Sequence, residues 1–184
     1  MGRRRRRMIY FTSDLHLGHI NVLKYDNRPF KTIGEHDNTL IKNWNSVIAN
    51  KDIVYVLGDF FWYGDKNLIE RTLQRLNGAI HIILGNHDTK LEKEPIRNRF
   101  ESISSLKTIN VDKKTHLTLC HYQMATWYKS HYPGSYHLFG HSHGNMKSLS
   151  QKALDVGTMT NNYFPYSLDK IMSIFSANDE TTLL

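Results

Sequence analysis

Cysteine is almost absent from this chain. The 184 residues include a single cysteine, Cys120, so no disulfide can form within the chain. Small secreted proteins that depend on disulfides are therefore excluded, and an intracellular, cytoplasmic location is expected. Long apolar runs are missing too, because none approaches the roughly eighteen residues that a membrane-spanning helix needs. We expect no membrane association.

Linkers and internal repeats are also absent. The chain has only four prolines, and no stretch rich in proline, glycine and serine divides it. Its 40% of hydrophobic residues and its length are typical of one globular domain. We therefore expect a single domain over residues 8–184, preceded by a basic run at residues 1–7 that is disordered.

Acidic residues are too few to balance the basic ones. The formal net charge is +7, and Arg3 to Arg7 supply five of these charges, which leaves +2 for the rest of the chain. A basic run beside the first residue is typical of a disordered tail, and it is also typical of segments that bind nucleic acid. A nucleic-acid partner reached through Arg3 to Arg7 therefore stays open.

Three short apolar runs in the first half predict buried strands. They are Met8 to Thr12, Ile53 to Leu57 and Ile80 to Leu84. Apolar residues at helical spacing lie between them, at residues 40–48 and 68–76, and Thr32 with Glu35 predicts a capping box. Alternating strands and helices favour an α/β domain with a largely parallel sheet.

The second half predicts a second sheet. Ile103 to Asn110 and Thr115 to Cys120 flank a turn and predict a hairpin, and His137 to Phe139 and Ala153 to Val156 are further strand candidates. Too few helices follow to cover this sheet separately. The two sheets are therefore expected to pack face to face.

Five polar clusters stand at the ends of these strands. They are Asp14-Leu15-His16, Gly58-Asp59, Gly85-Asn86-His87-Asp88, His121, and Gly140-His141-Ser142-His143-Gly144. Open α/β sheets bind ligands at the carboxyl ends of their strands, so the clusters are expected to converge there. The glycines allow tight turns and a close approach of the backbone to a bound phosphate.

The donor atoms in these clusters suit divalent metal ions. Oxygen and nitrogen ligands favour manganese, iron, nickel or zinc, and we expect manganese. The candidates exceed what one ion takes from protein; they are Asp14, His16, Asp59, Asn86, His121, His141 and His143. The sequence therefore predicts two divalent ions about 3.5–4 Å apart, with an Asp between them.

The ordered series of clusters resembles the signature of calcineurin-like metallophosphoesterases and runs from Asp14 to His143. The chain is also similar to small bacterial and phage members of that superfamily, in the segment Ser13 to His19, in Asn21 and in Arg28-Pro29-Phe30. The resemblance implies the metallo-dependent phosphatase-like fold, a four-layer α/β/β/α sandwich of two mixed sheets.

The resemblance also implies roles for individual residues. Asp14, His16, Asp59 and His143 match the ligands of one metal, and Asp59, Asn86, His121 and His141 match those of the other. In the family, a hydroxide that bridges the two ions attacks phosphorus in line. His87 is then expected to face the phosphate as a general acid or an electrostatic stabiliser, so Asp59 and His87 are the expected catalytic residues.

Four further residues are candidates for substrate contact. His19 and Arg28 follow the first metal loop, and a guanidinium could clamp phosphate oxygens. Trp127 and Tyr128 belong to an aromatic segment between two expected ligands and could stack a flat leaving group such as a nucleobase, although both could also pack the rim of the site.

The expected function is hydrolysis of a small phosphodiester or phosphomonoester, with a nucleotide as the preferred substrate. One alternative is a nuclease acting on DNA or RNA, although a charge of +2 outside the arginine run disfavours a basic groove. The other is a binding module that kept the fold and lost its catalysis, which the presence of His87 and a full ligand set disfavours. The sequence leaves the oligomeric state open.

Overall fold

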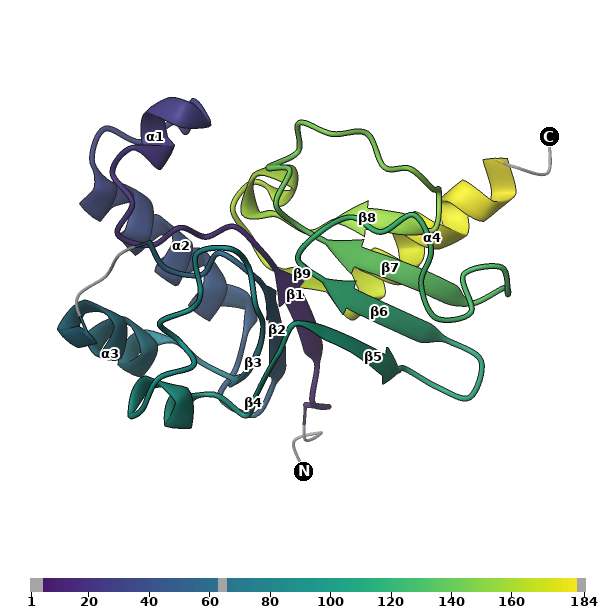
Figure 1. Cartoon of the computed structure of the whole chain (residues 1–184), viewed down its shortest axis with the longest axis horizontal. Coiled ribbons are helices and arrows are strands. Elements are labelled where there is room, and N and C mark those ends of the chain that lie inside the picture. Colours follow the sequence, from purple (N-terminus) through teal and green to yellow (C-terminus); the bar gives the residue numbers. More distant parts are fainter. Residues whose placement is uncertain (1–4, 63–65, 182–184) are drawn as a thin grey trace.

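The three apolar runs of the first half form the centre of a five-stranded sheet in the computed structural model, which describes residues 5–62 and 66–181 (Figure 1). Its strand order is β4-β3-β2-β1-β9. The strands span β1 Ile9–Thr12, β2 Ile53–Leu57, β3 Ala79–Ile83, β4 Ser102–Ser104 and β9 Tyr166–Ser167. All neighbours pair in parallel except β1 and β9, which are antiparallel.

Helices cover one face of this sheet. Short helix α1 spans Val22–Tyr25, α2 spans Ile33–Val47 and α3 spans Lys66–Arg75. The predicted cap at Thr32 is confirmed, because its side chain accepts a hydrogen bond from the Glu35 amide. Buried apolar side chains of α2 and α3 join those of β2 and β3 in one core cluster. Figure 1 shows all three helices on the same side of the sheet.

The second half forms a four-stranded sheet of order β5-β6-β7-β8. Its strands span β5 Leu106–Asn110, β6 His116–Cys120, β7 Ser135–Phe139 and β8 Ala153–Asp155. The predicted hairpin is confirmed, because β5 and β6 pair antiparallel, whereas β6, β7 and β8 are parallel. The two sheets share a buried core in which Phe11 and Leu57 of the first sheet join Leu119 and Leu138 of the second.

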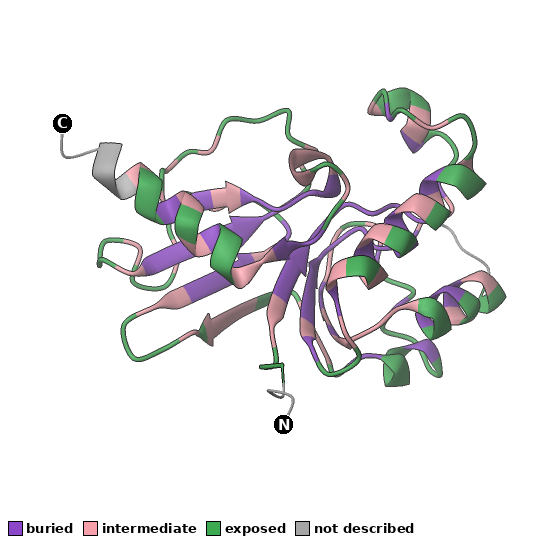
Figure 2. Ribbon diagram, turned by 180° about the vertical axis from the view of Figure 1, so that it is seen from behind, coloured by how far each residue is buried: buried purple, intermediate pink, exposed green. Residues whose placement is uncertain are grey.

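Two features differ from the sequence prediction. The run Ile103 to Asn110 is not one strand, because β4 pairs with β3 in the first sheet and β5 pairs with β6 in the second. Helix α4, Leu168–Thr181, was not expected; Phe175 stacks on Tyr136 of β7 with ring centroids 4.3 Å apart. Figure 2 shows α4 over the second sheet with its exposed residues outward. The expected α/β fold with two mixed sheets is confirmed.

The basic run is only partly described, since Arg3 and Arg4 lie outside the described residues. Arg5 is not free: its guanidinium lies 2.9 Å from the buried carboxylate of Asp52 and also contacts the Tyr10 hydroxyl. Arg6 and Arg7 are exposed. The structure therefore gives Arg5 defined partners, and the expected disorder of residues 1–7 stays a prediction. Within residues 5–62 and 66–181, no helix combines the length and apolar character that crossing a membrane requires.

Candidate metal centre

The loops after five strands meet where the two sheets come together. Asp14 follows β1, Asp59 follows β2, and the Asn86–His87 segment follows β3, all in the first sheet. His121 follows β6 and the His141–His143 segment follows β7, both in the second sheet. A hydrogen bond joins the two halves: the His141 backbone amide donates to the Asp14 side-chain carboxylate at 2.9 Å. The predicted convergence of the clusters is therefore observed.

Two groups of ligand atoms lie next to each other, and Asp59 belongs to one and borders the other. Asp14, His16 and His143 form one group, and Asp59, His121 and His141 form the other; within each group the ligand atoms lie within 4.8 Å of one another. Asp59 Oδ2 is 3.6 Å from His16 Nε2 in the first group and 3.6 Å from His121 Nε2 in its own. The Asn86 side-chain oxygen lies 3.2 Å from His121 Nε2, which places Asn86 beside the second group.

The backbone at these positions is unusual. Five of the predicted ligand residues, none of them glycine, have positive φ values: Asp14, His16, Asp59, His141 and His143. Such conformations are uncommon for residues with a side chain and concentrate at functional sites. Glycine is required where the loops touch, because a Cβ at Gly85 would overlap Asp59 Oδ1 and one at Gly140 would overlap the Ser13 hydroxyl.

The chemistry of the donor set fits cations. Carboxylate oxygens and imidazole nitrogens face one another, with His16 Nε2 and His143 Nε2 only 3.2 Å apart. Burial lowers the pKa of His143, but the carboxylates of Asp14 and Asp26 outweigh burial and raise this pKa to about 9. This shift shows that the first group favours a positive charge. Burial lowers the pKa of His16 to about 3, so its ring is neutral and able to act as a ligand.

Three carboxylates outside the ligand set hold the loops in place. Asp26 Oδ2 lies 2.6 Å from His143 Nδ1, which orients the ring so that Nε2 faces the first group. Asp88 accepts hydrogen bonds from the amides of Asp59, Phe60 and Gly85, and burial raises its pKa to about 6 although these bonds oppose the shift. Asp155 accepts from the Ser142 hydroxyl and the Gly144 amide. The sequence motifs gave no indication of Asp26 and Asp155.

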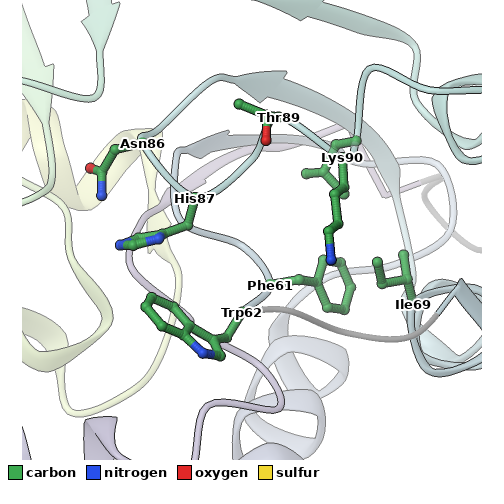
Figure 3. Close-up of a pocket in the computed structure, with 8 residues that line it drawn as sticks. Phe61, Trp62, Ile69, Asn86, His87, Thr89 and Lys90 are labelled. Atoms are coloured by element: carbon green, nitrogen blue, oxygen red, sulfur yellow. The ribbon is translucent and has the colours of Figure 1, made fainter.

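His87 lies at the mouth of the site. Its Nε2 is 3.8 Å from Asp59 Oδ2, its backbone amide donates to Asp59 Oδ1, and its side chain is 29% exposed. The ring contacts Trp62, with centroids 4.3 Å apart. Figure 3 shows the His87 and Trp62 rings together at one side of a cavity with Lys90 opposite. His87 is thus close to both ligand groups without belonging to either.

His19 is brought to the site as predicted, but Arg28 is turned away from it. The His19 ring stacks on Trp62 at 3.7 Å and lines the pocket over the ligand groups. Arg28 is buried, with 4% exposure, and its guanidinium donates to the backbone carbonyls of Asp14 and Leu15 and to Asp26. The predicted phosphate contact of Arg28 is therefore wrong in this structure, because its donors hold the metal loop.

In the aromatic segment after His121, Tyr122 packs on His121 and His141, whereas the two predicted contact residues lie away from the ligand groups. Tyr128 packs on His116, the first residue of β6, at the end of the strand opposite His121. Trp127 packs against His137 in the middle of β7, with ring centroids 5.4 Å apart, and is absent from the pocket lining. The structure thus contradicts the predicted substrate contacts of Trp127 and Tyr128, because this loop covers the second sheet instead.

Comparisons with known proteins agree with this geometry. The model of the family described as calcineurin-like phosphoesterase matches residues 8–152. An uncharacterised protein of Methanocaldococcus jannaschii is 35% identical over 175 residues, which cover 91% of each chain. The Gene 66 protein of Mycobacterium phage L5 is 40% identical over 81 residues, covering 43% of this chain and 39% of the phage protein.

A solved structure has the same fold over nearly the whole chain. A protein of unknown function from Aquifex aeolicus superposes with a TM-score of 0.74 and 26% identity, covering 92% of this chain and 100% of the other. The family implies divalent metal ions, and two groups of ligands stand ready to hold them. The chain belongs to the calcineurin-like phosphoesterase family and is a metal-dependent phosphoester hydrolase.

Proposed function

We propose that the protein hydrolyses phosphodiesters or phosphomonoesters of small molecules, nucleotides being the preferred candidates, with two divalent cations, manganese first among them. One observation carries the proposal: Asp59 Oδ2 lies 3.6 Å from a histidine nitrogen of each ligand group. A carboxylate between two such groups is the arrangement that two-metal hydrolases use.

Each residue of the site has a role in this proposal. Asp14, His16 and His143 hold one cation, His121, His141 and Asn86 hold the other, and Asp59 is shared. Two bound cations supply an activated water and positive charge for the phosphoryl oxygens. His87, whose Nε2 is 3.8 Å from Asp59 Oδ2, is within reach of a leaving-group oxygen and donates a proton to it. Trp62 packs against the His87 ring and limits its rotation.

Removal and restoration of metal test the proposal. Protein stripped by a chelator should lose hydrolysis of bis(4-nitrophenyl) phosphate, and added Mn²⁺ should restore it. Asp59→Asn should lower the rate at least about a hundredfold, because the shared carboxylate is lost. Asp169→Asn, an exposed acidic residue of α4, is the control. Activity that survives chelation, or that Asp59→Asn leaves unchanged, would refute the two-metal proposal.

The proton donor has its own test. His87→Gln should retain both ions and lose about 10²–10⁴ in rate on esters with a basic alkoxide leaving group. The loss should be much smaller for a nitrophenolate, which leaves without a proton. Rates across a series of esters of graded leaving-group pKa measure this dependence. Equal losses across the series would make His87 a stabiliser of the phosphoryl oxygens.

A further inference from the structure

The pocket over the ligand groups has no lysine or arginine in the part of its wall that the structure describes. Beyond the ligand residues and His87, this wall consists of His19, Val22, Tyr25, Asp26 and Trp62. Arg28, the first arginine after the metal loop of Asp14 and His16, is buried with its guanidinium against the backbone of that loop. Lys90 lines the neighbouring cavity instead (Figure 3).

The charge of this wall limits the charge of the substrate. Bound cations can receive the phosphoryl oxygens at the ligand groups, but a further negative charge would lie among aromatic side chains and beside Asp26, whose carboxylate already occupies the Arg28 guanidinium. A charge in such surroundings has no free cation to compensate it, which is unfavourable away from water. A phosphodiester has one negative charge at neutral pH, whereas a phosphomonoester has up to two. The wall therefore favours the diester.

His19 supplies an unused hydrogen-bonding group in the same wall. Its exposure is 5%, and neither ring nitrogen has a hydrogen-bond partner. A buried polar group left without a partner destabilises the fold, so such groups call for an explanation. The ring cannot easily turn away, because it lies parallel to Trp62 with an interplanar angle of 4°. Its centroid is 5.5 Å from that of the expected ligand His16.

We propose that the substrate is a phosphodiester with uncharged organic groups on both esterified oxygens, and that His19 is the side chain that hydrogen-bonds the bound diester. This inference rests on the proposed function, because it assigns a substrate class to the same site. His19 donates from one ring nitrogen to an ester or hydroxyl oxygen of the substrate, and Trp62 fixes the direction of that bond.

Two esters with one leaving group test the charge preference. Methyl 4-nitrophenyl phosphate is singly charged, and 4-nitrophenyl phosphate is doubly charged at pH 8. For Mn²⁺-loaded protein, kcat/KM should be at least about tenfold higher for the diester. An equal or higher value for the monoester would overturn the inference while leaving the proposed hydrolase function intact. Hydrolysis of neither ester would count against the proposed function itself.

A charge added at the rim sharpens this test. Tyr25 lines the pocket and is 73% exposed, so Tyr25→Arg brings a cation to the wall with little risk to folding. The ratio of monoester to diester kcat/KM should rise about two- to fivefold. Tyr25→Gln is the matched neutral control and should not change the ratio. A ratio that Tyr25→Arg leaves unchanged would show that charge does not decide the preference.

Binding of an unreactive diester tests His19 without any need for turnover. Calorimetry should show that His19→Ala weakens binding of dimethyl phosphate by about five- to tenfold, the loss of one hydrogen bond, while bound metal stays constant. Ile20→Ala, at the exposed neighbouring position, should bind as the parent does. Unchanged affinity in His19→Ala would refute the contact. Much tighter binding of methyl phosphate than of dimethyl phosphate would refute the charge preference, even in protein that hydrolyses nothing.

Discussion

One oxygen of Asp26 supports two functional side chains. Asp26 Oδ2 is 2.6 Å from His143 Nδ1 and 2.9 Å from the Arg28 guanidinium, and Arg28 in turn holds the carbonyls of the first metal loop. A carboxylate behind a ligand histidine fixes the ring and raises its basicity. Asp26 therefore acts on the first ligand group from outside it.

The consequence for metal binding can be measured. Asp26→Asn should weaken the site of Asp14, His16 and His143 by about 10–100-fold, because the His143 ring loses its charged partner. The other site should change little, since its residues do not touch Asp26. Metal content per chain, followed by titration with Mn²⁺, separates the two sites. Equal weakening of both sites would contradict the assignment of His143 to the first group.

Asp52 is a buried carboxylate that stabilises the start of the chain. Its oxygens accept from the amides of Met8 and Ala49 at 3.0 and 2.9 Å, and Arg5 lies beside it. Burial raises the pKa of Asp52, but these bonds and the guanidinium outweigh burial and hold it below its ordinary value of 3.8. A carboxyl whose pKa is lower in the folded state stabilises the fold above its unfolded pKa and loses that effect as the pH falls through the folded value.

Unfolding in urea should reveal this contribution. Asp52→Ala should lower the free energy of unfolding by about 1–3 kcal/mol at pH 7, because two buried amides lose their acceptor. The difference between variant and parent should shrink at pH values below 3.8, where the carboxyl becomes protonated. Arg5→Ala should cost about 1 kcal/mol or less, since its side chain is 46% exposed. Equal losses in the two variants would assign the effect to the ion pair instead.

At the level of elements, the sequence predicted the strands and the hairpin that have a local sequence pattern. The buried strands β1, β2 and β3 were evident from apolar runs, and the β5–β6 hairpin from two runs around a turn. The division of Ile103 to Asn110 into β4 and β5 had no local signal, because an extended chain can change sheets without a glycine or proline. Helix α4 was not predicted, although Leu168, Ile171 and Phe175 recur at helical spacing.

The site shows the same contrast between residues that the local sequence indicates and residues that only the folded structure brings together. Every expected ligand residue was evident from the ordered motifs, whereas Asp26 and Asp155, which hold the ligand loops, were not. Asp26 contacts His143 across 117 positions of sequence, and such pairs become visible only after folding. Arg28, Trp127 and Tyr128 were misplaced for the converse reason: closeness in sequence to a ligand does not fix the direction of a side chain. Tyr128 ends at the far end of β6 because its loop crosses the second sheet.

The loop after β3 illustrates how an element fixes the geometry of the site. Gly85 passes so close to Asp59 that a Cβ would overlap both its carboxylate oxygen and its backbone nitrogen. Gly85→Ala should therefore displace Asp59 and reduce Mn²⁺ binding and hydrolysis at least about a hundredfold. Gly34→Ala, in α2, is the matched control, since its nearest neighbour is 4.0 Å away, and it should stabilise the protein by about 0.4–1 kcal/mol. Normal metal content in Gly85→Ala would show that the loop can shift enough to accommodate the added Cβ without displacing Asp59.

At the scale of the whole molecule, the metal centre joins the two sheets. Asp14, Asp59 and Asn86 come from loops of the first sheet, and His121, His141 and His143 come from loops of the second. The first ligand group therefore combines both sheets, and so does the second. Ions bound here would act as cross-links between two halves of the chain that also share an apolar core and the hydrogen bond from the His141 amide to Asp14.

Metal binding should consequently raise the thermal stability of the entire domain. A ligand that binds only the folded state, present at a thousandfold excess over its Kd, stabilises by roughly 4 kcal/mol. For a domain of this size, each kcal/mol shifts Tm by about 2–4 °C, so Mn²⁺ should raise Tm by about 8–16 °C in calorimetry. Asp59→Asn should lose most of this increase, because one substitution affects both groups. The metal-free Tm of Asp59→Asn should be equal to or higher than that of the metal-free parent. The parent then buries a charged carboxylate with no cation beside it, whereas the variant buries a neutral amide. An increase of the same size in Asp59→Asn and the parent would show that the stabilising ions bind elsewhere.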